Sequence, residues 1–518
     1  MTDGSGVLIF FKDFSERGGD RYFLWSDGAL TETDAHKIVE MTVRLVCHDY
    51  WLISPAIFRS AGKLPVSVVD VVEFERGTSG RRISKAVRER QDVRQTLLGF
   101  CDEAVVDSYL SAFYRQAELD ASTLAVIGDA LSRHWTELLG QAKSKGEFER
   151  AIDVELPVFN ELTSCVVHGI RVDEAKLREH KKTVDVDYYL TLKRFAEKHE
   201  LPYEVPRDDV VVERLESRGF DMSGVSLDYI LRLLPMQDGF GDDLIELKRI
   251  HASRSILNRL SVGAGRVFPI LDSQATVTSR IYFRDPALQG LPGYYRDVII
   301  PDKGMELSYV DYDQFEVGVM AALSSDPKML SLYSSGDLYL EVSRSLFECD
   351  EKRGFAKRLF LSYAYGMRQK ALIDAASASG GTRLSAKQFF TEFNVFEEWK
   401  RSINAEFEKN GRIGTSMGNY LQRELVGPLT PKECRSSVSQ VVQGTAALIF
   451  KKAILKVASL PGVKIKVPMH DALLVQHPPG FDRCLLMDTF ASAMTEHFGG
   501  SIAGKASIEP FFKARGPG

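Results

Sequence analysis

The pattern of hydrophobic and polar positions changes several times along the 518 residues of this chain, and each change predicts a different element. Residues 306–310 form an apolar run of strand length that ends at Asp311. An apolar run with helical spacing follows from Val317 to Leu323 and closes at a Ser-Ser-Asp-Pro turn. The pattern predicts a buried strand whose tip carries a carboxylate, held by a sheet yet facing a cleft.

A second β-rich stretch lies at residues 466–475, where two short runs flank His470 and Asp471. This pattern predicts a hairpin with a second carboxylate at its turn. Two aspartates on neighbouring strands can share two Mg²⁺ ions about 3.5–4 Å apart, as in in-line phosphoryl transfer. A single strand-end aspartate is usually a cap or a turn residue, so the interpretation depends on both stretches.

Between the two aspartates, residues 337–422 are predicted to be mostly helical, with a basic helix at residues 352–367. Its charges recur every four residues, which places Arg353 and Lys357 on one face. Taken alone, such charges usually form a solvated face. Beside two carboxylates for metal ions, a cationic helix predicts a nucleotidyl-transfer site.

The first 150 residues predict a separate α/β unit. Strand-like runs lie at residues 7–11, 21–25, 49–54 and 66–74, and helical runs at residues 33–47, 81–98 and 120–139. The basic segment at residues 76–94 is interpreted as a solvated helix face in preference to a nucleic-acid patch.

Two long helices rich in Lys and Arg are predicted at residues 174–200 and 241–260. An arm of this kind can lie along a duplex and contact its phosphates, and a plain helical spacer is an equal alternative. From Arg266 the pattern returns to β signals and turns, and one long helix is predicted at residues 434–459.

Composition sets limits on these interpretations. The length predicts several domains, and the net charge of −5 does not exclude a nucleic-acid partner, because recognition depends on where the charges lie. The six cysteines form no CxxC pair, which predicts reduced thiols and no zinc site. We expect no signal peptide, no membrane partner and a cytoplasmic location, in a bacterial cell or a phage-infected host.

Taken together, these stretches resemble the motifs of the family A DNA polymerases, the class of bacterial DNA polymerase I. Residues 311–316 (Asp-Tyr-Asp-Gln-Phe-Glu) are similar to the first family motif, Asp-Tyr-Ser-Gln-Ile-Glu, and residues 353–366 to the second, Arg-x3-Lys-x7-Tyr-Gly. His470-Asp471-Ala472 resembles the third, His-Asp-Glu. Residues 278–292 and 435–447 resemble palm segments, so that the resemblance extends from about Ala151 to the C-terminus.

The resemblance implies a multidomain α/β and α+β fold, a polymerase right hand preceded by an RNase H-like 3′–5′ exonuclease-type domain. The expected divisions are an exonuclease-like domain at residues 1–150, a thumb with its leading helix at 151–265, the first part of the palm at 266–336, fingers at 337–426 and the second part of the palm at 427–518. A short form without a 5′-nuclease resembles phage or plasmid replicative enzymes.

The resemblance also implies roles for single residues. Asp311, Asp471 and the Tyr312 backbone carbonyl would hold two Mg²⁺ ions, for which Mn²⁺ can substitute, and Lys357 would donate a proton to pyrophosphate. The implied nucleotide-binding residues are Arg353, Lys357, Leu361, Tyr365, Glu316, Gln314 and Tyr339. The implied DNA-binding residues are Arg280, Gln289, Arg435, Ser439, Gln443, His470 and Gly366.

Glu316 would be the steric gate of this site: tethered to the Tyr365 hydroxyl, it leaves no room for a 2′-OH. The implied function is a template-directed DNA polymerase that adds dNTPs to a primer 3′-OH. Its partners are primer–template DNA and dNTPs, with a processivity factor or other replication proteins as further candidates.

The chain departs from the family pattern at several positions. Ala472 replaces the third carboxylate, and Leu361 stands where relatives have Phe or Tyr, which predicts discrimination against dideoxynucleotides. Gly318, Ser439 and Tyr339 stand where relatives often carry Arg, Asn and His. These departures leave the chemistry intact and bear on fidelity and nucleotide preference.

The first strand lacks the Asp-x-Glu that a 3′–5′ exonuclease needs, and the strand predicted around Trp51 leads to Ser54-Pro-Ala-Ile-Phe-Arg, with no carboxylate. Asp13 and Asp120 are the nearest remaining aspartates. We therefore predict a vestigial exonuclease fold and a polymerase without proofreading.

Three other functions compete with this prediction. A single-subunit RNA polymerase shares the two aspartates and the Lys…Tyr-Gly helix, but Glu316 and the helix containing Gln443 argue against it. A catalytically silent DNA-binding factor would not need the intact set of Asp311, Asp471, Arg353 and Lys357. A metal phosphohydrolase would need more His and Asp ligands close to His470.

Overall fold

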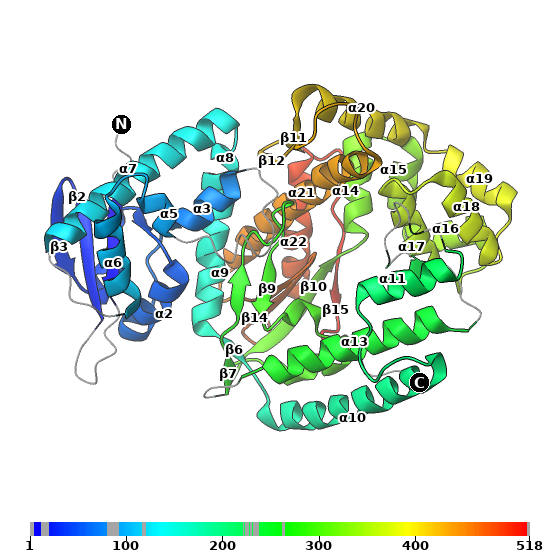
Figure 1. The fold of residues 1–518 in the computed structure, drawn as a ribbon, viewed down its shortest axis with the longest axis horizontal. Coiled ribbons are helices and arrows are strands. Elements are labelled where there is room, and N and C mark those ends of the chain that lie inside the picture. The colour runs from blue at the N-terminus through cyan, green and yellow to red at the C-terminus, as the bar shows by residue number, and fades with distance from the viewer. Residues whose placement is uncertain are drawn as a thin grey trace.

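The computed structural model describes residues 5–11, 20–79, 93–115, 121–220, 222, 227, 230–231, 238–261 and 265–514. An N-terminal unit, blue in Figure 1, lies beside a larger body that surrounds a central sheet. Each has its own hydrophobic core, one built from buried residues between 7 and 159 and the other from residues between 154 and 502. The two cores meet along the helix α9 (Leu156–His168).

The N-terminal unit is a five-stranded sheet in the order β3-β2-β1-β4-β5, packed between helices. Its strands are β1 (Gly6–Phe11), β2 (Arg21–Ser26), β3 (Ala29–Thr33), β4 (Leu45–Cys47) and β5 (Val68–Asp70). Its helices are α1 (Ala35–Glu40), α2 (Tyr50–Ala61), α3 (Val71–Thr78), α5 (Val93–Leu97), α6 (Glu103–Arg115) and α7 (Ala121–Lys145). The first three strands form an antiparallel meander, and β4 and β5 run parallel to β1.

Two predicted strands of this unit are wrong. Residues 49–54 belong to the start of helix α2, and the strand lies earlier, at β4. The predicted strand at residues 66–74 ends at Asp70, whose carboxylate accepts hydrogen bonds from two backbone N–H groups and caps α3. A short apolar run has the same composition in a buried strand and in a buried helix, so that periodicity alone does not separate them.

The segment after the N-terminal unit is helical and includes a long arm, at the bottom of Figure 1. Its elements are α8 (Phe148–Arg150), a π-helical turn η1 (Ala151–Glu155), α9, α10 (Glu174–His199), α11 (Asp208–Ser217) and α13 (Phe240–Arg259). Helices α10 and α13 pack along each other and are joined by ion pairs such as Arg194–Glu246 and Lys198–Asp243. Both long helices were predicted from the sequence and are confirmed.

The central sheet of the larger body has four antiparallel strands in the order β13-β14-β10-β15. The strands are β10 (Glu306–Tyr312), β13 (Lys464–Met469), β14 (Ala472–His477) and β15 (Ala506–Glu509). Helices α14 (Phe315–Ser324), α21 (Pro431–Ala458) and α22 (Arg483–His497) belong to the same body. Smaller elements are β6 (Ile170–Arg171), β7 (Arg266–Val267), β8 (Ile270–Asp272), β9 (Tyr282–Asp285), η2 (Leu288–Gly290) and η3 (Gly293–Val298).

A helical region lies between the two halves of this sheet in sequence and at the right of Figure 1. Its helices are α15 (Pro327–Ser334), α16 (Leu338–Phe347), α17 (Arg353–Ala364), α18 (Gln369–Ala378), α19 (Arg383–Thr391) and α20 (Asn394–Asn410). The predicted basic helix is α17. A hairpin of β11 (Arg412–Thr415) and β12 (Gly418–Gln422), which the sequence analysis did not predict, follows α20. In the part of the chain described above, no helix has an apolar stretch that could cross a membrane.

Candidate active site

The two aspartates predicted from the strand patterns are neighbours in the central sheet. Strand β10 pairs with β14, and this register places Asp311 opposite Ala472, next to Asp471. The Tyr312 N–H donates to the backbone carbonyl of Asp471 at 3.3 Å. Two aspartates 160 positions apart are therefore fixed side by side by backbone pairing, as the two sequence patterns predicted.

Negative charge accumulates at this position. Burial raises the pKa of Asp311 to about 7, and the carboxylates of Asp471, Glu509 and Asp313 add to the rise, while Lys357 opposes it. Burial also raises the pKa of Asp471. The excess of partly buried carboxylate is what a divalent cation would neutralise, and oxygen ligands are those that Mg²⁺ prefers.

The donor set is small. Among the residues that the structure describes, no three His, Cys, Asp or Glu side chains gather into a metal cluster. Two aspartates with a backbone carbonyl leave most positions around an ion to water and substrate, which suits Mg²⁺, because this ion usually keeps several of its waters. The residues present therefore fit the metal site that the sequence predicted.

We predict that Asp311→Asn stabilises the metal-free protein at alkaline pH. The folded state binds the Asp311 proton up to about pH 7 and the unfolded state only near the ordinary value of 3.8, so this group's contribution to stability is lost as pH rises between them. The variant should therefore exceed wild type by about 1–3 kcal/mol at about pH 8, and by much less at about pH 4. Urea unfolding with a chelator measures this difference.

Glu306 provides the control, since it lies at the other end of β10 in an exposed ion pair with Arg483. Glu306→Gln removes a carboxylate from the same strand and should not give the alkaline stabilisation expected of Asp311→Asn. If the unfolding free energy of Asp311→Asn depended on pH as that of wild type does, a raised pKa of Asp311 in the folded state would be contradicted.

The cationic pair on α17 lies one helical turn apart over a single aromatic ring. The Arg353 guanidinium is 5.8 Å and the Lys357 ammonium 5.2 Å from the centroid of the Tyr339 ring. Arg353 also forms an ion pair with Asp337, the residue that caps α16. The positive charge of Lys357 acts on both aspartates and lowers the pKa of each.

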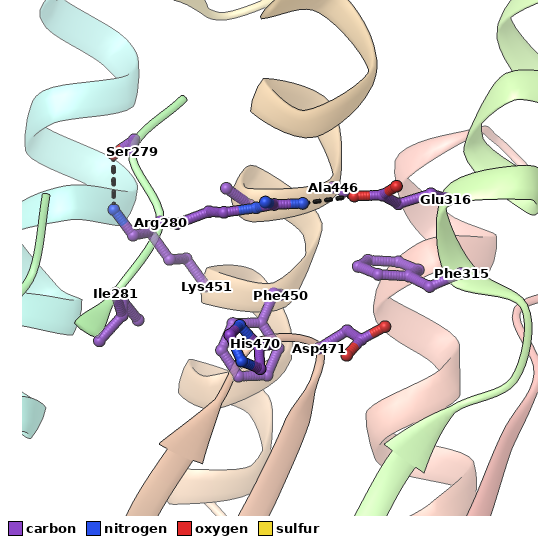
Figure 2. Close-up of a pocket in the computed structure, with 11 residues that line it drawn as sticks. Ser279, Arg280, Ile281, Phe315, Glu316, Ala446, Phe450, Lys451, His470 and Asp471 are labelled. Atoms are coloured by element: carbon purple, nitrogen blue, oxygen red, sulfur yellow. Dashed lines mark hydrogen bonds and ion pairs between the residues drawn. The ribbon is translucent and has the colours of Figure 1, made fainter. Parts of the chain in front are cut away.

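Glu316 is held from two sides. The Tyr365 hydroxyl donates to its carboxylate at 2.5 Å, the contact that the sequence analysis expected. The Arg280 guanidinium forms an ion pair with its other oxygen, and Figure 2 shows this pair spanning the site. Burial and the Glu316 charge raise the pKa of Tyr365 far above its ordinary value, so its hydroxyl stays a donor. Arg280, predicted to bind DNA, is therefore paired with Glu316 in this structure.

Arg280, Glu316 and Asp471 border one pocket of about 180 Å³ (Figure 2). Asp471 and Glu316 face it from one side and Lys451 lies on the other. His470 lies at the turn of the β13–β14 hairpin, in the left-handed backbone conformation (φ = 54°), with its ring 5.9 Å from that of Tyr282.

In two of the predicted site residues, Gln314 and Gln289, the side-chain amide is hydrogen-bonded to backbone groups of this protein. The Gln314 amide donates to the Gly336 carbonyl at 2.6 Å and accepts from the Leu338 N–H at 3.1 Å, which ties α14 to α16. The Gln289 amide is bonded to the N–H and carbonyl of Phe283, both at 3.1 Å, and braces β9. Their predicted contacts with nucleotide and DNA would require these bonds to be exchanged or shared.

The remaining predicted residues lie around the same region. Leu361 packs against the larger core, and Gly366, with φ of 85°, ends α17 beside Arg435, whose Cγ would lie 3.4 Å from an added Cβ. Ser439 and Gln443 are half-buried on α21. Gly318 is enclosed, because an added Cβ would lie 2.7 Å from Tyr333 and Met494, so the arginine of relatives has no room here.

The sequence analysis missed Lys451, Glu155 and Ser279. Lys451 is completely buried on α21 in the run Leu448-Ile449-Phe450-Lys451, and its amine bonds to both other residues. A lysine on the buried face of an apolar helix was the available signal, since such a charge needs a buried partner.

The prediction of an inactive exonuclease stays untested. Asp13 and Asp120 lie outside the described residues. The correction to β4 places one carboxylate, that of Asp49, directly after a strand, where it accepts a hydrogen bond from Tyr114 of α6. The expectation that this strand leads to no carboxylate was wrong, because it rested on the misplaced strand.

Comparisons with known proteins agree with this geometry. The family model for DNA polymerase family A matches residues 243–496. DNA polymerase I of Deinococcus radiodurans is 24% identical over 465 residues, which cover 80% of this chain and 48% of that protein. DNA polymerase I of Helicobacter pylori (strain J99) is 27% identical over 220 residues, which cover 39% of this chain and 24% of that protein. The chain thus spans about a quarter to a half of the length of these curated relatives.

A solved structure covers nearly the whole chain. The POL domain of Pol1 from M. smegmatis, in a complex with DNA primer-template and dNTP, aligns over 97% of this chain and 94% of that one, with a TM-score of 0.71 and 18% identity. The fold is therefore that of a polymerase right hand with an α/β unit in front of it, as the resemblance implied. Residues 243–496 of this chain match the model of DNA polymerase family A, and the fold of nearly the whole chain is that of the POL domain.

Proposed function

We propose that this protein is a template-directed DNA polymerase that adds deoxynucleotides to a primer 3′-OH by two-metal-ion nucleotidyl transfer. The observation that carries the proposal is the pairing of β10 with β14, which sets Asp311 beside Asp471 in reach of the Lys357 charge. Accumulated carboxylate facing a cation on a separate element suits a reaction that moves negatively charged phosphates.

Asp311, Asp471 and the Tyr312 carbonyl would hold the two Mg²⁺ ions. When bound, the ions lower the pKa of the primer 3′-OH and offset the charge of the triphosphate. Lys357, one turn from Arg353, would hold a proton at its Nζ for the leaving pyrophosphate. Both cations stack over Tyr339, which limits where their charges can lie.

Selection of the sugar would fall to Glu316. Its carboxylate is held by Arg280 and Tyr365, so it cannot swing away to admit a 2′-OH without breaking two charge-assisted bonds. Relaxing this hold would weaken the preference for deoxynucleotides.

The domain assignment is part of the same proposal. Residues 151–265 would form the thumb, 337–426 the fingers, and 266–336 with 427–518 the palm. Residues 1–150 would be an exonuclease-like unit without proofreading. The solved relative, which its description places with DNA primer-template and dNTP, supports primer–template DNA and dNTPs as the partners.

Primer extension tests the proposal. A labelled primer–template is incubated with the protein, Mg²⁺ and dNTPs, beside reactions with rNTPs and with no nucleotide, and one primer ends in a mismatch. Template-directed extension with dNTPs is expected, and the primer without nucleotides should stay uncut. Extension with rNTPs alone would favour the RNA polymerase alternative, and tight DNA binding without extension would favour a silent DNA-binding factor.

A further inference from the structure

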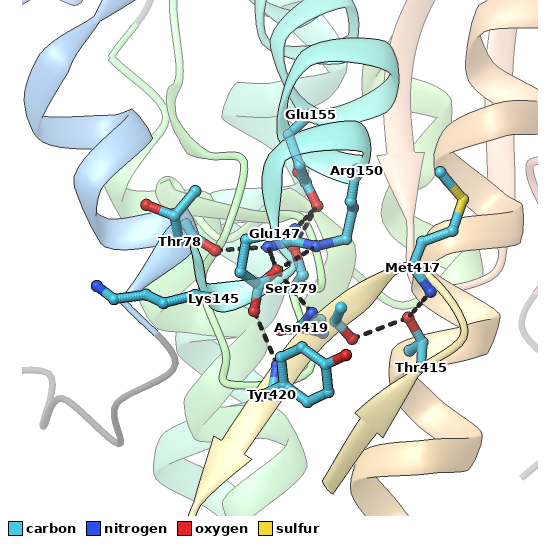
Figure 3. A network of polar contacts seen from close by, with 12 residues as sticks. Thr78, Lys145, Glu147, Arg150, Glu155, Ser279, Thr415, Met417, Asn419 and Tyr420 are labelled. Atoms are coloured by element: carbon cyan, nitrogen blue, oxygen red, sulfur yellow. Dashed lines mark hydrogen bonds and ion pairs between the residues drawn. The ribbon is translucent and has the colours of Figure 1, made fainter. Parts of the chain in front are cut away.

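A buried network of charges joins the N-terminal unit to the pocket (Figure 3). The side chains of Lys451, Arg150, Glu147 and Glu155 are 0%, 1%, 1% and 6% exposed. Withdrawing four charges from water is costly, and a well-packed apolar cluster of the same volume is often at least as stable. Stability alone is therefore a weak explanation for this network, and its geometry indicates a more specific role.

At one end, the network is hydrogen-bonded to the N-terminal unit and to the β11–β12 hairpin. Arg150 donates to Glu147 at 2.8 Å and to the Gly77 carbonyl, at the end of α3, at 2.6 Å. Glu147 in turn accepts from the N–H groups of Asn419 and Tyr420 at 2.8 and 3.0 Å. Three segments distant in sequence thus meet at two side chains.

The π-helical turn η1 makes the next connection. Arg150 and Glu155 are five residues apart and would diverge around a regular α-helix, but the wider turn at residues 151–155 brings them together at 2.5 Å. The turn therefore carries the network from the N-terminal unit into the larger body.

At the other end, the network is hydrogen-bonded to the Ser279 hydroxyl. Its hydroxyl donates to Glu155 at 2.8 Å, and the Lys451 amine bonds to the Ser279 oxygen at 2.7 Å and to Glu155 at 2.5 Å. Ser279 has a φ of 60°, a left-handed conformation that a serine adopts only when its surroundings impose it. The two bonds of the Ser279 hydroxyl, together with the bond from its N–H to the Thr276 carbonyl at 2.9 Å, hold the residue in this conformation.

Ser279 directly precedes Arg280, which is the partner of Glu316, the proposed gate residue. Figure 2 shows the bond between Lys451 and Ser279 and the ion pair between Arg280 and Glu316. The loop is closed on itself, because the Ala275 N–H donates to the Arg280 carbonyl at 2.9 Å and the Arg280 N–H to the Thr276 hydroxyl at 3.2 Å. A displacement of Ser279 therefore carries Arg280 with it.

The N-terminal unit touches this loop a second time. The Gln274 amide donates to the Glu73 carbonyl of α3 at 3.5 Å, and a Cβ on Gly77 would lie 2.2 Å from the Gln274 Oε1 atom. The Gln274 side chain therefore rests directly on the backbone of α3 at Gly77.

We propose that Arg150, Glu155 and Lys451 are positioning residues that fix Ser279, and through it the Arg280–Glu316 pair, so that the N-terminal unit sets how strictly the site excludes ribonucleotides. This inference rests on the proposed function. It gives a unit predicted to lack proofreading a role in nucleotide selection.

Ser279→Gly is the decisive variant, since glycine adopts a positive φ without strain and only the hydroxyl bonds are lost. The kcat/KM ratio for a dNTP over the matching rNTP should fall about five- to tenfold, mainly through KM, with little change in Tm. The control is Lys456, which lies on the same helix as Lys451 and forms an exposed ion pair with Glu496 of α22. Lys456→Ala should leave the ratio unchanged.

Arg150 provides a graded pair of variants. Arg150→Met removes both ion pairs and should lower the ratio as Ser279→Gly does, whereas Arg150→Lys keeps the charge and should retain part of the selectivity. If wild type extends primers but the folded Ser279→Gly protein keeps the wild-type ratio, or loses kcat equally for both nucleotides, the inference is overturned and the proposed function stands. If wild type extends no primer, the proposed function itself fails, and the inference with it.

Discussion

Replacing Asp311 or Asp471 by asparagine should reduce primer extension on the order of 10³-fold or more, because each carboxylate would hold the metal ions, whose charge stabilises the reacting phosphates by several kcal/mol. Asparagine keeps the shape of the side chain, and the β10–β14 pairing that holds both positions involves only the backbone. The loss would therefore report charge and not misfolding. Single-turnover extension with saturating Mg²⁺ and dNTP measures it.

The matched control is again Glu306→Gln, a carboxylate on the same strand that faces Arg483 and not the pocket. Its extension rate should equal that of wild type. An Asp471→Asn protein that extends primers within a few fold of wild type would remove the basis for the two-metal proposal.

Lys357→Ala should lower kcat by about 10²- to 10³-fold, the range for the loss of a positioned proton donor. The ammonium charge acts on both aspartates and is held over the Tyr339 ring, so no water would replace it with the same charge. KM for dNTP should rise as well, since the same charge binds the phosphates.

Arg358→Ala separates this effect from a general loss of positive charge. Arg358 is the next residue on α17, where its guanidinium stacks over Phe355 at 5.7 Å. Its removal should cost much less than the removal of Lys357. If Lys357→Ala and Arg358→Ala lowered kcat equally, Lys357 would be part of a solvated basic face and not a proton donor.

The predicted loss of activity at Asp311 is accompanied by a predicted gain in stability. The site concentrates carboxylates that repel one another, so asparagine at Asp311 should stabilise the metal-free fold while it removes activity. Opposite effects of one substitution on stability and on rate would be direct evidence that this cluster is maintained for function.

Local patterns in the sequence were sufficient for the elements that carry the chemistry. Strand β10, helix α14 and the β13–β14 hairpin follow from periodicities of two and 3.6 residues, which the backbone imposes over a few residues. The shared face of Arg353 and Lys357 follows from their spacing of four. In the N-terminal unit the same reasoning misplaced two strands, because short buried runs have no period to distinguish them.

Only the tertiary structure decided which of these side chains act on one another. The register of β10 on β14 brings Asp311 to Asp471, and the fold brings Arg280 to Glu316 and occupies the amides of Gln314 and Gln289. Lys451 and Glu155 meet across 296 positions of sequence. Pairings over such distances depend on how whole elements pack, and no local periodicity encodes them. The sequence by itself therefore determined which groups this protein has for its chemistry, and the packing of the chain decided their partners.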